Sequence, residues 1–245
     1  MESSKIVLCI PGLWKNRGEL IEAIVRKSEG YLFAGKYISK LGDPSIFFEV
    51  DIYEHDERVA EAFEIAGYNS FTEEDLDLIR EHSLTLYLIG DGGSIEKIRK
   101  LVDTANALVK AGGLGVKVES SGTANTIESW NDMYHTDNAV ELFQAFVTVA
   151  EEDDFYYTCG MHCFGLPDVI TFKDQVTPQY AQELMNVFCL YNLIENPSLT
   201  DYSTFSLDEE NPHFILQHTE CKHFSEDELF YNQYGIWALV KKEII

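Results

Sequence analysis

The sequence is short of positive charge. Its 245 residues include 18 lysines and arginines against 42 aspartates and glutamates, which gives a formal net charge of −24 at pH 7. The shortage is uneven: residues 118–221 hold eighteen acidic residues and one basic residue, Lys173, and residues 49–81 hold twelve acidic residues against Arg58 and Arg80. Nucleic acids and anionic membranes are bound through lysine and arginine. We therefore expect these acidic surfaces to bind neither.

Long apolar runs are also lacking. Nowhere do about 18 apolar residues follow one another, so no transmembrane helix is expected. The first residues combine an acidic second position with an apolar run of about six, whereas a signal peptide needs a basic start and a longer apolar stretch. The cysteines are few, odd in number and far apart, at Cys9, Cys159, Cys163, Cys189 and Cys221. Reduced thiols fit this usage, and together these absences predict a cytoplasmic protein.

The rest of the composition is that of a folded chain, with 45% hydrophobic and 13% aromatic residues. In the first half, apolar patterns predict strands at residues 5–10, 31–39, 46–53, 84–89 and 114–119, and helices at 18–28, 55–66, 72–82 and 94–112. We expect 84–89 to be a central strand beside 5–10 or 114–119. The order β-α-β-β-α-β with one extra helix indicates a ferredoxin-like sheet covered by helices.

The second half also mixes strands and helices. Helices are predicted at residues 138–151 and 177–194, and strands at 155–164, 168–172, 202–207, 214–219 and 235–240. The predicted fold class is α+β, with mixed, mainly antiparallel sheets flanked by helices. We expect a ferredoxin-like N-terminal lobe at 1–135 and a closely packed α+β C-terminal lobe at 136–245, or one continuous domain.

Three segments carry a family resemblance. They are 84–130, with G-V-K-V-E-S-S-G at 115–122; 155–169, with Y-T-C-G-M-H-C-F-G-L-P-D at 157–168; and 230–242, with N-Q-Y-G-I-W-A-L at 232–239. In this order they resemble the bacterial family called domain of unknown function 4261, with Asp168 in place of its usual glutamate. The resemblance implies an architecture and no established activity. It also implies contact-toxin genes as neighbours, which favours an immunity protein.

Three groups of residues invite a ligand. The turn Gly90-Asp91-Gly92-Gly93-Ser94 precedes a predicted helix, where backbone N–H groups bind anions, but it has no Walker lysine, and a plain tight turn is favoured. Cys159, His162 and Cys163 resemble a metal site. On a strand, however, the two cysteines lie roughly 13 Å apart and His162 points to the other face. His213, Cys221 and His223, with His218 opposite, lack zinc spacing. We expect no cofactor and no metal.

The alternative hypothesis, that the protein is an enzyme, depends on the segment Glu119–Thr123. A serine beside a glycine at the end of a strand invites a nucleophile, but G-x-S-x-G is absent and no base is fixed by spacing. A loop cap is the more common role for such a segment. If the chain is an enzyme of unrecognised class, Glu119, Ser121 and His162 are its candidate residues, although we expect no catalytic site.

Runs of acidic residues are the candidate binding sites. We expect a basic partner to contact the residues Glu73, Glu74, Asp75, Glu151, Glu152, Asp153, Asp154, Asp208, Glu209 and Glu210. A fourth run occupies 226–228. Any one run is typical of a solvated loop or helix start. Taken together, so many unneutralised carboxylates repel one another and favour a basic protein partner.

The leading hypothesis is a cytosolic immunity protein that occludes a basic bacterial toxin such as a nuclease. Tyr68, Trp14 and Phe71 are its expected aromatic anchors, because charge alone rarely gives tight binding. A structural protein without a ligand remains the third alternative.

Overall fold

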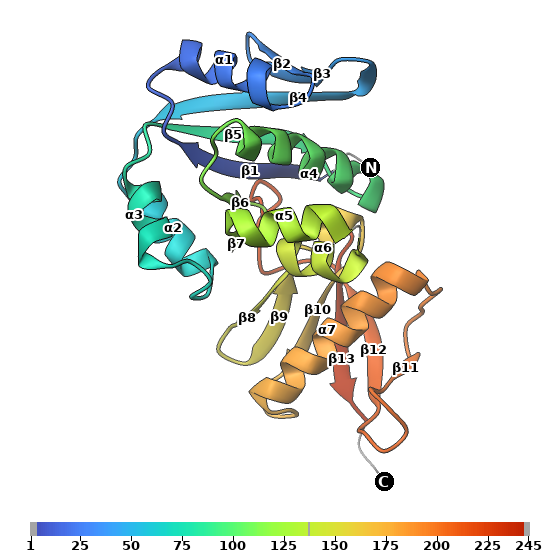
Figure 1. The fold of residues 1–245 in the computed structure, drawn as a ribbon. Helices are drawn as coiled ribbons and strands as arrows, with labels where there is room; N and C mark the ends of the chain where they lie inside the picture. The colour runs from blue at the N-terminus through green and yellow to red at the C-terminus, as the bar shows by residue number, and fades with distance from the viewer. Residues whose placement is uncertain (1–3, 137, 243–245) are drawn as a thin grey trace.

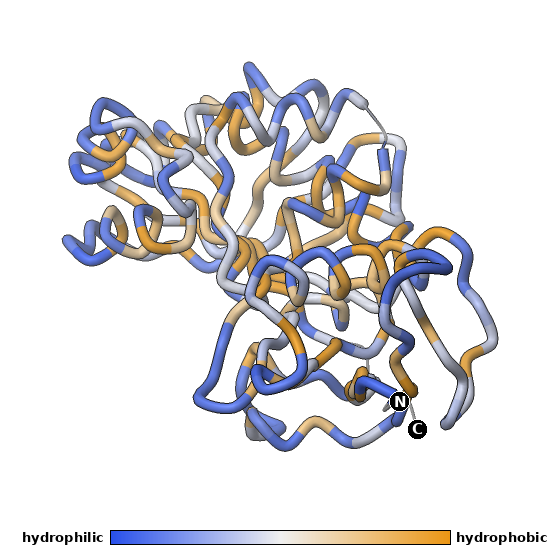
Figure 2. Tube along the Cα trace, turned by 90° about the horizontal axis from the view of Figure 1, so that it is seen from below, coloured by the Kyte–Doolittle hydropathy of each residue, from blue (hydrophilic) through white to orange (hydrophobic). Residues whose placement is uncertain are grey.

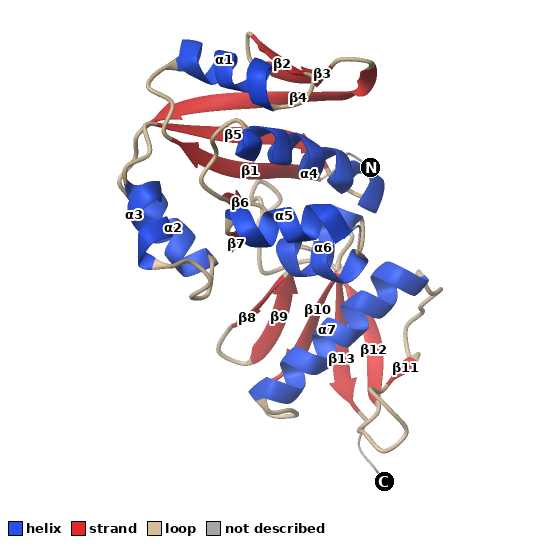
Figure 3. Ribbon diagram, viewed as in Figure 1, coloured by secondary structure: helices blue, strands red, loops and turns tan. Residues whose placement is uncertain are grey.

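The computed structural model describes residues 4–136 and 138–242, which form two β-sheets and the helices around them (Figures 1 and 3). The first sheet has the strand order β2-β3-β4-β5-β1-β6-β7, and the second has the order β11-β12-β13-β10-β9-β8. The α+β prediction is therefore confirmed. No helix in the described ranges is long and apolar enough to cross a bilayer.

Four strands of the first sheet have the ferredoxin-like order. They are β4 (Asp43–Glu54), β5 (Leu84–Asp91), β1 (Lys5–Gly12) and β6 (Val116–Val118), all antiparallel to their neighbours. The crossover helices are α1 (Arg17–Lys27) and α4 (Ile95–Lys110). The strand predicted at 84–89 is central, as expected, because it pairs with β4 on one side and β1 on the other.

Both edges of this sheet are extended. A hairpin of β2 (Tyr31–Ala34) and β3 (Tyr37–Lys40) adds to β4, and β7 (Thr123–Asn125) adds to β6. The single strand predicted at 31–39 was wrong, because the chain turns at Gly35, whose φ of +60° suits glycine.

The two faces of the first sheet are covered differently. Ile6, Leu8 and Ile10 alternate onto the face that joins the main core with α1 and α4. Cys9 and Tyr87 lie in a smaller cluster with α2 (Arg58–Ala66) and α3 (Glu73–Arg80), which pack at one end of the sheet (Figure 1). A capping box begins α3, since Thr72 and Asp75 bond reciprocally.

The second sheet consists of β8 (Thr148–Glu151), β9 (Phe155–Cys159), β10 (Asp168–Phe172), β11 (Thr204–Phe205), β12 (Phe214–Thr219) and β13 (Ile236–Lys241). The β10–β13 pair is parallel and the other pairs are antiparallel. Helix α7 (Pro178–Glu195) lies across this sheet, and α5 (Ile127–Thr136) and α6 (Ala139–Phe146) lie where the two sheets meet (Figure 1). One hydrophobic cluster includes residues of both halves, and apolar segments gather inside each half (Figure 2).

Two predictions for the second half need correction. The helix at 138–151 ends at Phe146, because the β-branched residues that follow favour the strand β8. The strand at 155–164 ends at Cys159, where Gly160 with a φ of +125° turns the chain into a short 3₁₀ helix, η1 (Met161–Phe164). Helix α5 was not predicted.

Candidate functional site

The structure separates the predicted acidic runs. Glu73, Glu74 and Asp75 form the first turn of α3 on the first sheet. Residues 151–154 form the turn between β8 and β9, and residues 208–210 lie in the loop between β11 and β12. Because β8 and β11 are opposite edges of the second sheet, these last two runs do not share a surface. Among the predicted residues, Asp75 lines a hollow that also holds carboxylates from elsewhere in the sequence.

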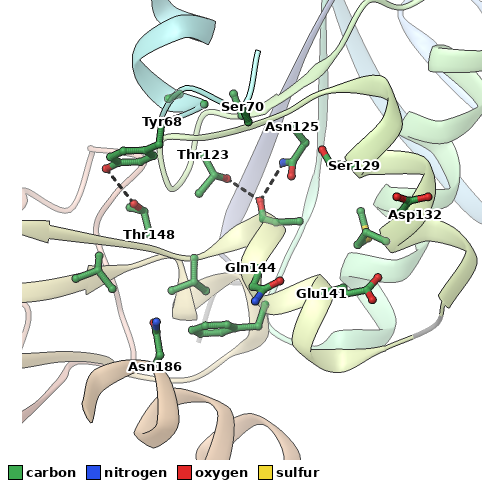
Figure 4. Close-up of a pocket in the computed structure, with 18 of the residues that line it drawn as sticks. Tyr68, Ser70, Thr123, Asn125, Ser129, Asp132, Glu141, Gln144, Thr148 and Asn186 are labelled. Atoms are coloured by element: carbon green, nitrogen blue, oxygen red, sulfur yellow. Dashed lines mark hydrogen bonds between the residues drawn. The ribbon is translucent and has the colours of Figure 1, made fainter. Parts of the chain in front are cut away.

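A cleft of about 770 Å³ lies where the two halves meet (Figure 4). Its lining comes from the loop between α2 and α3, from β7, α5, α6 and β8, and from α7. Phe143, Ala145 and Val147 supply apolar surface, and this volume lies within the range of small-ligand sites. A neighbouring hollow of about 580 Å³ shares Ser70 and Asp132 with the cleft and continues it to Asp75 and Glu128.

Amides, hydroxyls and two carboxylates give the cleft its polar lining. Asn125 and Thr123 both donate to the carbonyl of Ala145, at 3.3 and 2.7 Å, and so fix the edge of β7 against α6 (Figure 4). Gln144 and Asn186 lie along its middle, and Asp132 and Glu141 lie at one end (Figure 4). Glu141 accepts a hydrogen bond from Thr136.

Tyr68 stands at the other end of the cleft (Figure 4). Its side chain is 68% exposed, its hydroxyl lies 3.3 Å from the hydroxyl of Thr148, and its φ is +48°. A bulky residue at positive φ is strained, and here the strained backbone presents the exposed tyrosine ring to the cleft. The other two expected anchors were wrong, because Trp14 and Phe71 are buried core residues, only 4% and 9% exposed.

The cleft contains no positive charge of its own. Neither a lysine nor an arginine is among the described residues that line it. The one basic residue of 118–221, Lys173, is 2.9 Å from Glu151, at the end of β8 away from the cleft. Over the part of the chain that the structure describes, Asp132 and Glu141 form no ion pair with lysine or arginine. Both carboxylates are therefore available to a cation from outside.

A second hollow, of about 840 Å³, lies on the face of the first sheet that carries α2. Four carboxylates line it, at Asp51, Glu54, Asp56 and Glu57, together with Arg58. Arg58 donates two hydrogen bonds to Asp56, at 3.0 and 2.6 Å, and holds the pKa of that carboxyl well below its usual value. This hollow is acidic but partly neutralised.

The two halves of the chain are joined at a buried polar group that we call the junction cluster: Thr158, His162, Cys163, Asp168 and Asn232. Asp168, at the start of β10, accepts hydrogen bonds from Thr158 Oγ1 at 3.2 Å, from the backbone N–H of Met161 at 3.1 Å and from Asn232 Nδ2 at 2.6 Å. Burial nevertheless raises the pKa of Asp168 to about 7, against the opposing effect of these donors.

The histidine and cysteines beside Asp168 are not where a strand would place them. His162 is 1% exposed; its Nδ1 is 4.0 Å from Asp168 Oδ2 and has no hydrogen-bond partner, while its Nε2 is 3.9 Å from Cys163 Sγ. The argument from strand alternation was therefore wrong, because Cys159 ends β9 whereas His162 and Cys163 lie on η1. Burial lowers the pKa of His162 to about 4 and raises the pKa of the Cys159 and Cys163 thiols, so these thiols are held protonated.

The glycine-rich turn after β5 contacts the backbone next to the junction cluster. The N–H of Gly93 donates to the carbonyl of Cys163 at 2.8 Å, and a Cβ on Gly165 would lie 2.4 Å from the carbonyl oxygen of Gly93. Glycines are needed here because two backbones touch. This finding supports the tight-turn interpretation of 90–94.

The other candidate residues are also engaged in packing. Ser121 is buried, with its hydroxyl 3.3 Å from that of Thr123, and Glu119 pairs with Lys117. His223 packs on Phe155 with a ring separation of 4.6 Å. No group of three or more His, Cys, Asp or Glu side chains in the described ranges is arranged to hold a metal ion.

Sequence reasoning missed the residues that form the cleft. Asp132, Glu141, Gln144 and Asn186 come from three helices and are isolated in the sequence rather than in runs. A signal was available in the net charge of 118–221, which points to this region but not to individual positions.

Comparisons with known proteins identify a family and no relative of known function. No curated protein and no solved structure matches the chain. One family model matches, over residues 157–227, and this span contains the motif at 157–168 but neither of the other two. The family resemblance is thus confirmed: residues 157–227 are similar to the family described as Domain of unknown function (DUF4261).

Proposed function

We propose that this protein is an acidic, cytoplasmic binding protein that inhibits a basic protein partner by covering its charged site. The partner is a bacterial toxin such as a nuclease, and the chain is its immunity protein. A nuclease site is positively charged because it holds phosphate, so an acidic surface complements it. Nucleic acids and membranes are not ligands under this proposal.

The observation that carries this proposal is the cleft with its neighbouring hollow. Together they are lined by four carboxylates, at Asp75, Glu128, Asp132 and Glu141, and by no lysine or arginine among the described residues. Such unneutralised charge raises the association rate of a basic partner. The burial of Ser121 and of the Cys159 and Cys163 thiols supports binding over catalysis, because a substrate does not reach buried groups.

Co-expression with the protein encoded by the neighbouring gene tests the proposal. If that neighbour is a basic toxin, the wild type restores growth, and Ser121→Ala restores it equally. The on-rate falls steeply with added salt, since exposed charges are screened within about 8 Å at physiological ionic strength. A neighbour that is not inhibited rejects the proposal, and a Ser121→Ala variant that binds without protecting favours the enzyme alternative.

A further inference from the structure

We infer that the cleft of Figure 4 binds an extended segment of the partner protein, with an arginine guanidinium at the end where Asp132 and Glu141 lie. This inference rests on the proposed function and names the chemistry of its contact. The occupant is a peptide segment, rather than a small metabolite or a metal ion.

The charge of the cleft requires a cation. Two carboxylates lie at one end, and no basic side chain of the described lining faces them. Glu141 already accepts one hydrogen bond, through Oε2 from Thr136, which leaves its other oxygen for a second donor. A cation bound there forms ion pairs with the two carboxylates, and this attraction offsets the free-energy cost of removing the cation from water.

Arginine fits this end better than lysine or a metal ion. Its guanidinium carries five donors in a rigid plane, so one arginine can donate to more than one carboxylate oxygen at a time. Lysine is a point charge with three donors. A divalent metal prefers more oxygen ligands than these two side chains supply, and no metal-type cluster occurs within 4–136 and 138–242.

The middle of the cleft fits a peptide backbone. Gln144 and Asn186 each offer one carbonyl and one NH₂ group, which match the N–H and C=O of a peptide unit. The volume of about 770 Å³ also exceeds the need of one side chain and is comparable to a site for a drug-sized ligand.

Tyr68 gives the segment its second anchor. Its strained backbone presents an exposed ring at the end of the cleft opposite the carboxylates (Figure 4). Aromatic rings at such positions stack on apolar, aromatic or cationic side chains and are enriched at binding hot spots. A segment that contacts both Tyr68 and the carboxylates runs along the cleft from one end to the other (Figure 4).

A short blocked peptide with one central arginine between alanines and glycines is the probe, with citrulline and lysine versions as controls. Citrulline keeps the shape of arginine without its charge. Binding is measured by amide chemical shifts of the full chain. The arginine peptide should shift the resonances of residues 123–125 and 141–149, and the citrulline peptide should bind at least about tenfold more weakly. The lysine peptide should fall between them.

Charge-matched variants locate the site. Asp132→Asn with Glu141→Gln should weaken the arginine peptide by about tenfold or more, whereas Asp153→Asn with Glu152→Gln, equal in charge but outside the cleft, should change it less than about twofold. Equal binding of citrulline, equal loss in both double variants, or shifts outside the cleft would overturn the inference.

The outcomes separate this inference from the proposed function. If no peptide binds but a basic neighbour is inhibited and tolerates the Asp132→Asn with Glu141→Gln variant, the cleft is not the contact and the proposed function stands. If the peptide binds as expected but no basic protein is inhibited, the cleft recognises arginine segments for another purpose.

Discussion

Carboxylates occupy two contrasting regions of this molecule. In the junction cluster, Asp168 is buried and receives three hydrogen bonds from groups of its own chain. In the cleft, Asp132 and Glu141 belong to an open hollow without basic side chains among its described lining. A carboxylate whose donors are all internal stabilises architecture, whereas one without a cation is free to bind.

The residues that carry the family resemblance lie in the junction cluster rather than in the cleft. The motif at 157–168 contributes Thr158, His162 and Asp168 to the junction, and the motif at 232–239 begins with Asn232, which closes it. These motif residues hold the second sheet against the turn after β5. In this chain the matched residues 157–227 therefore contribute to the joint between the two sheets, and the cleft lies mostly outside them.

The largest effect is expected at Asp168. Replacing it with alanine leaves Thr158, Asn232 and the N–H of Met161 without their acceptor in a buried site. The free energy of unfolding should fall by about 3–5 kcal/mol in urea titration. Asp153→Ala, in an exposed turn, should change it by less than about 0.5 kcal/mol. A loss at Asp168 no larger than at Asp153 would show that the cluster is dispensable.

Local patterns predicted much of the fold. The period of the apolar residues predicted α4 to within one or two residues, and an apolar run predicted β5. The errors occur where backbone conformation overrides periodicity. Gly35 and Gly160 both adopt positive φ, and each ends a strand that sequence alone continued.

The candidate site was less predictable than the fold. Runs of acidic residues are visible in a sequence, but the runs at 151–154 and 208–210 lie at separate places on the second sheet, and Asp75 lies at the hollow beside the cleft. The cleft depends on how α5, α6 and α7 pack between the sheets, and α5 itself was missed. Tertiary packing, rather than any local pattern, brings Asp132 and Glu141 to one end of the cleft.

The second effect is a pH dependence inside the junction cluster. The folded pKa of Asp168 is raised to about 7, so its contribution to stability is lost as pH rises from about 4 to 7. The folded pKa of His162 is lowered to about 4, so its contribution is lost as pH falls from about 6.5 to 4. Between pH 4 and 6.5 the two contributions oppose each other, and their sum is nearly flat.

Single substitutions should expose each contribution. In Asp168→Asn only the pH-dependent contribution of His162 remains. The free energy of unfolding should therefore rise by on the order of 3 kcal/mol from pH 4 to 6.5 relative to wild type. His162→Gln leaves Asp168, and the free energy should fall by a similar amount from pH 4 to 7. Urea titrations across this range measure both slopes. Slopes of the same sign in the two variants would contradict the assigned protonation states.

The smallest effect on stability is expected at Tyr68 in the cleft, and it has the opposite sign to the loss expected at Asp168 in the junction cluster. Tyr68 has a φ of +48°, which glycine adopts without strain, so Tyr68→Gly should leave stability unchanged or raise it by up to about 1 kcal/mol. The same variant should weaken binding of the arginine peptide, because the ring is lost.

Tyr202 offers a matched control, since it is exposed and has a φ of +69° but does not line the cleft. Tyr202→Gly should change stability in the same way and leave peptide binding intact. Equal loss of binding in both variants would contradict a binding role for the Tyr68 ring. Destabilisation by several kcal/mol in Tyr68→Gly would show that this ring stabilises the fold, as the junction cluster does.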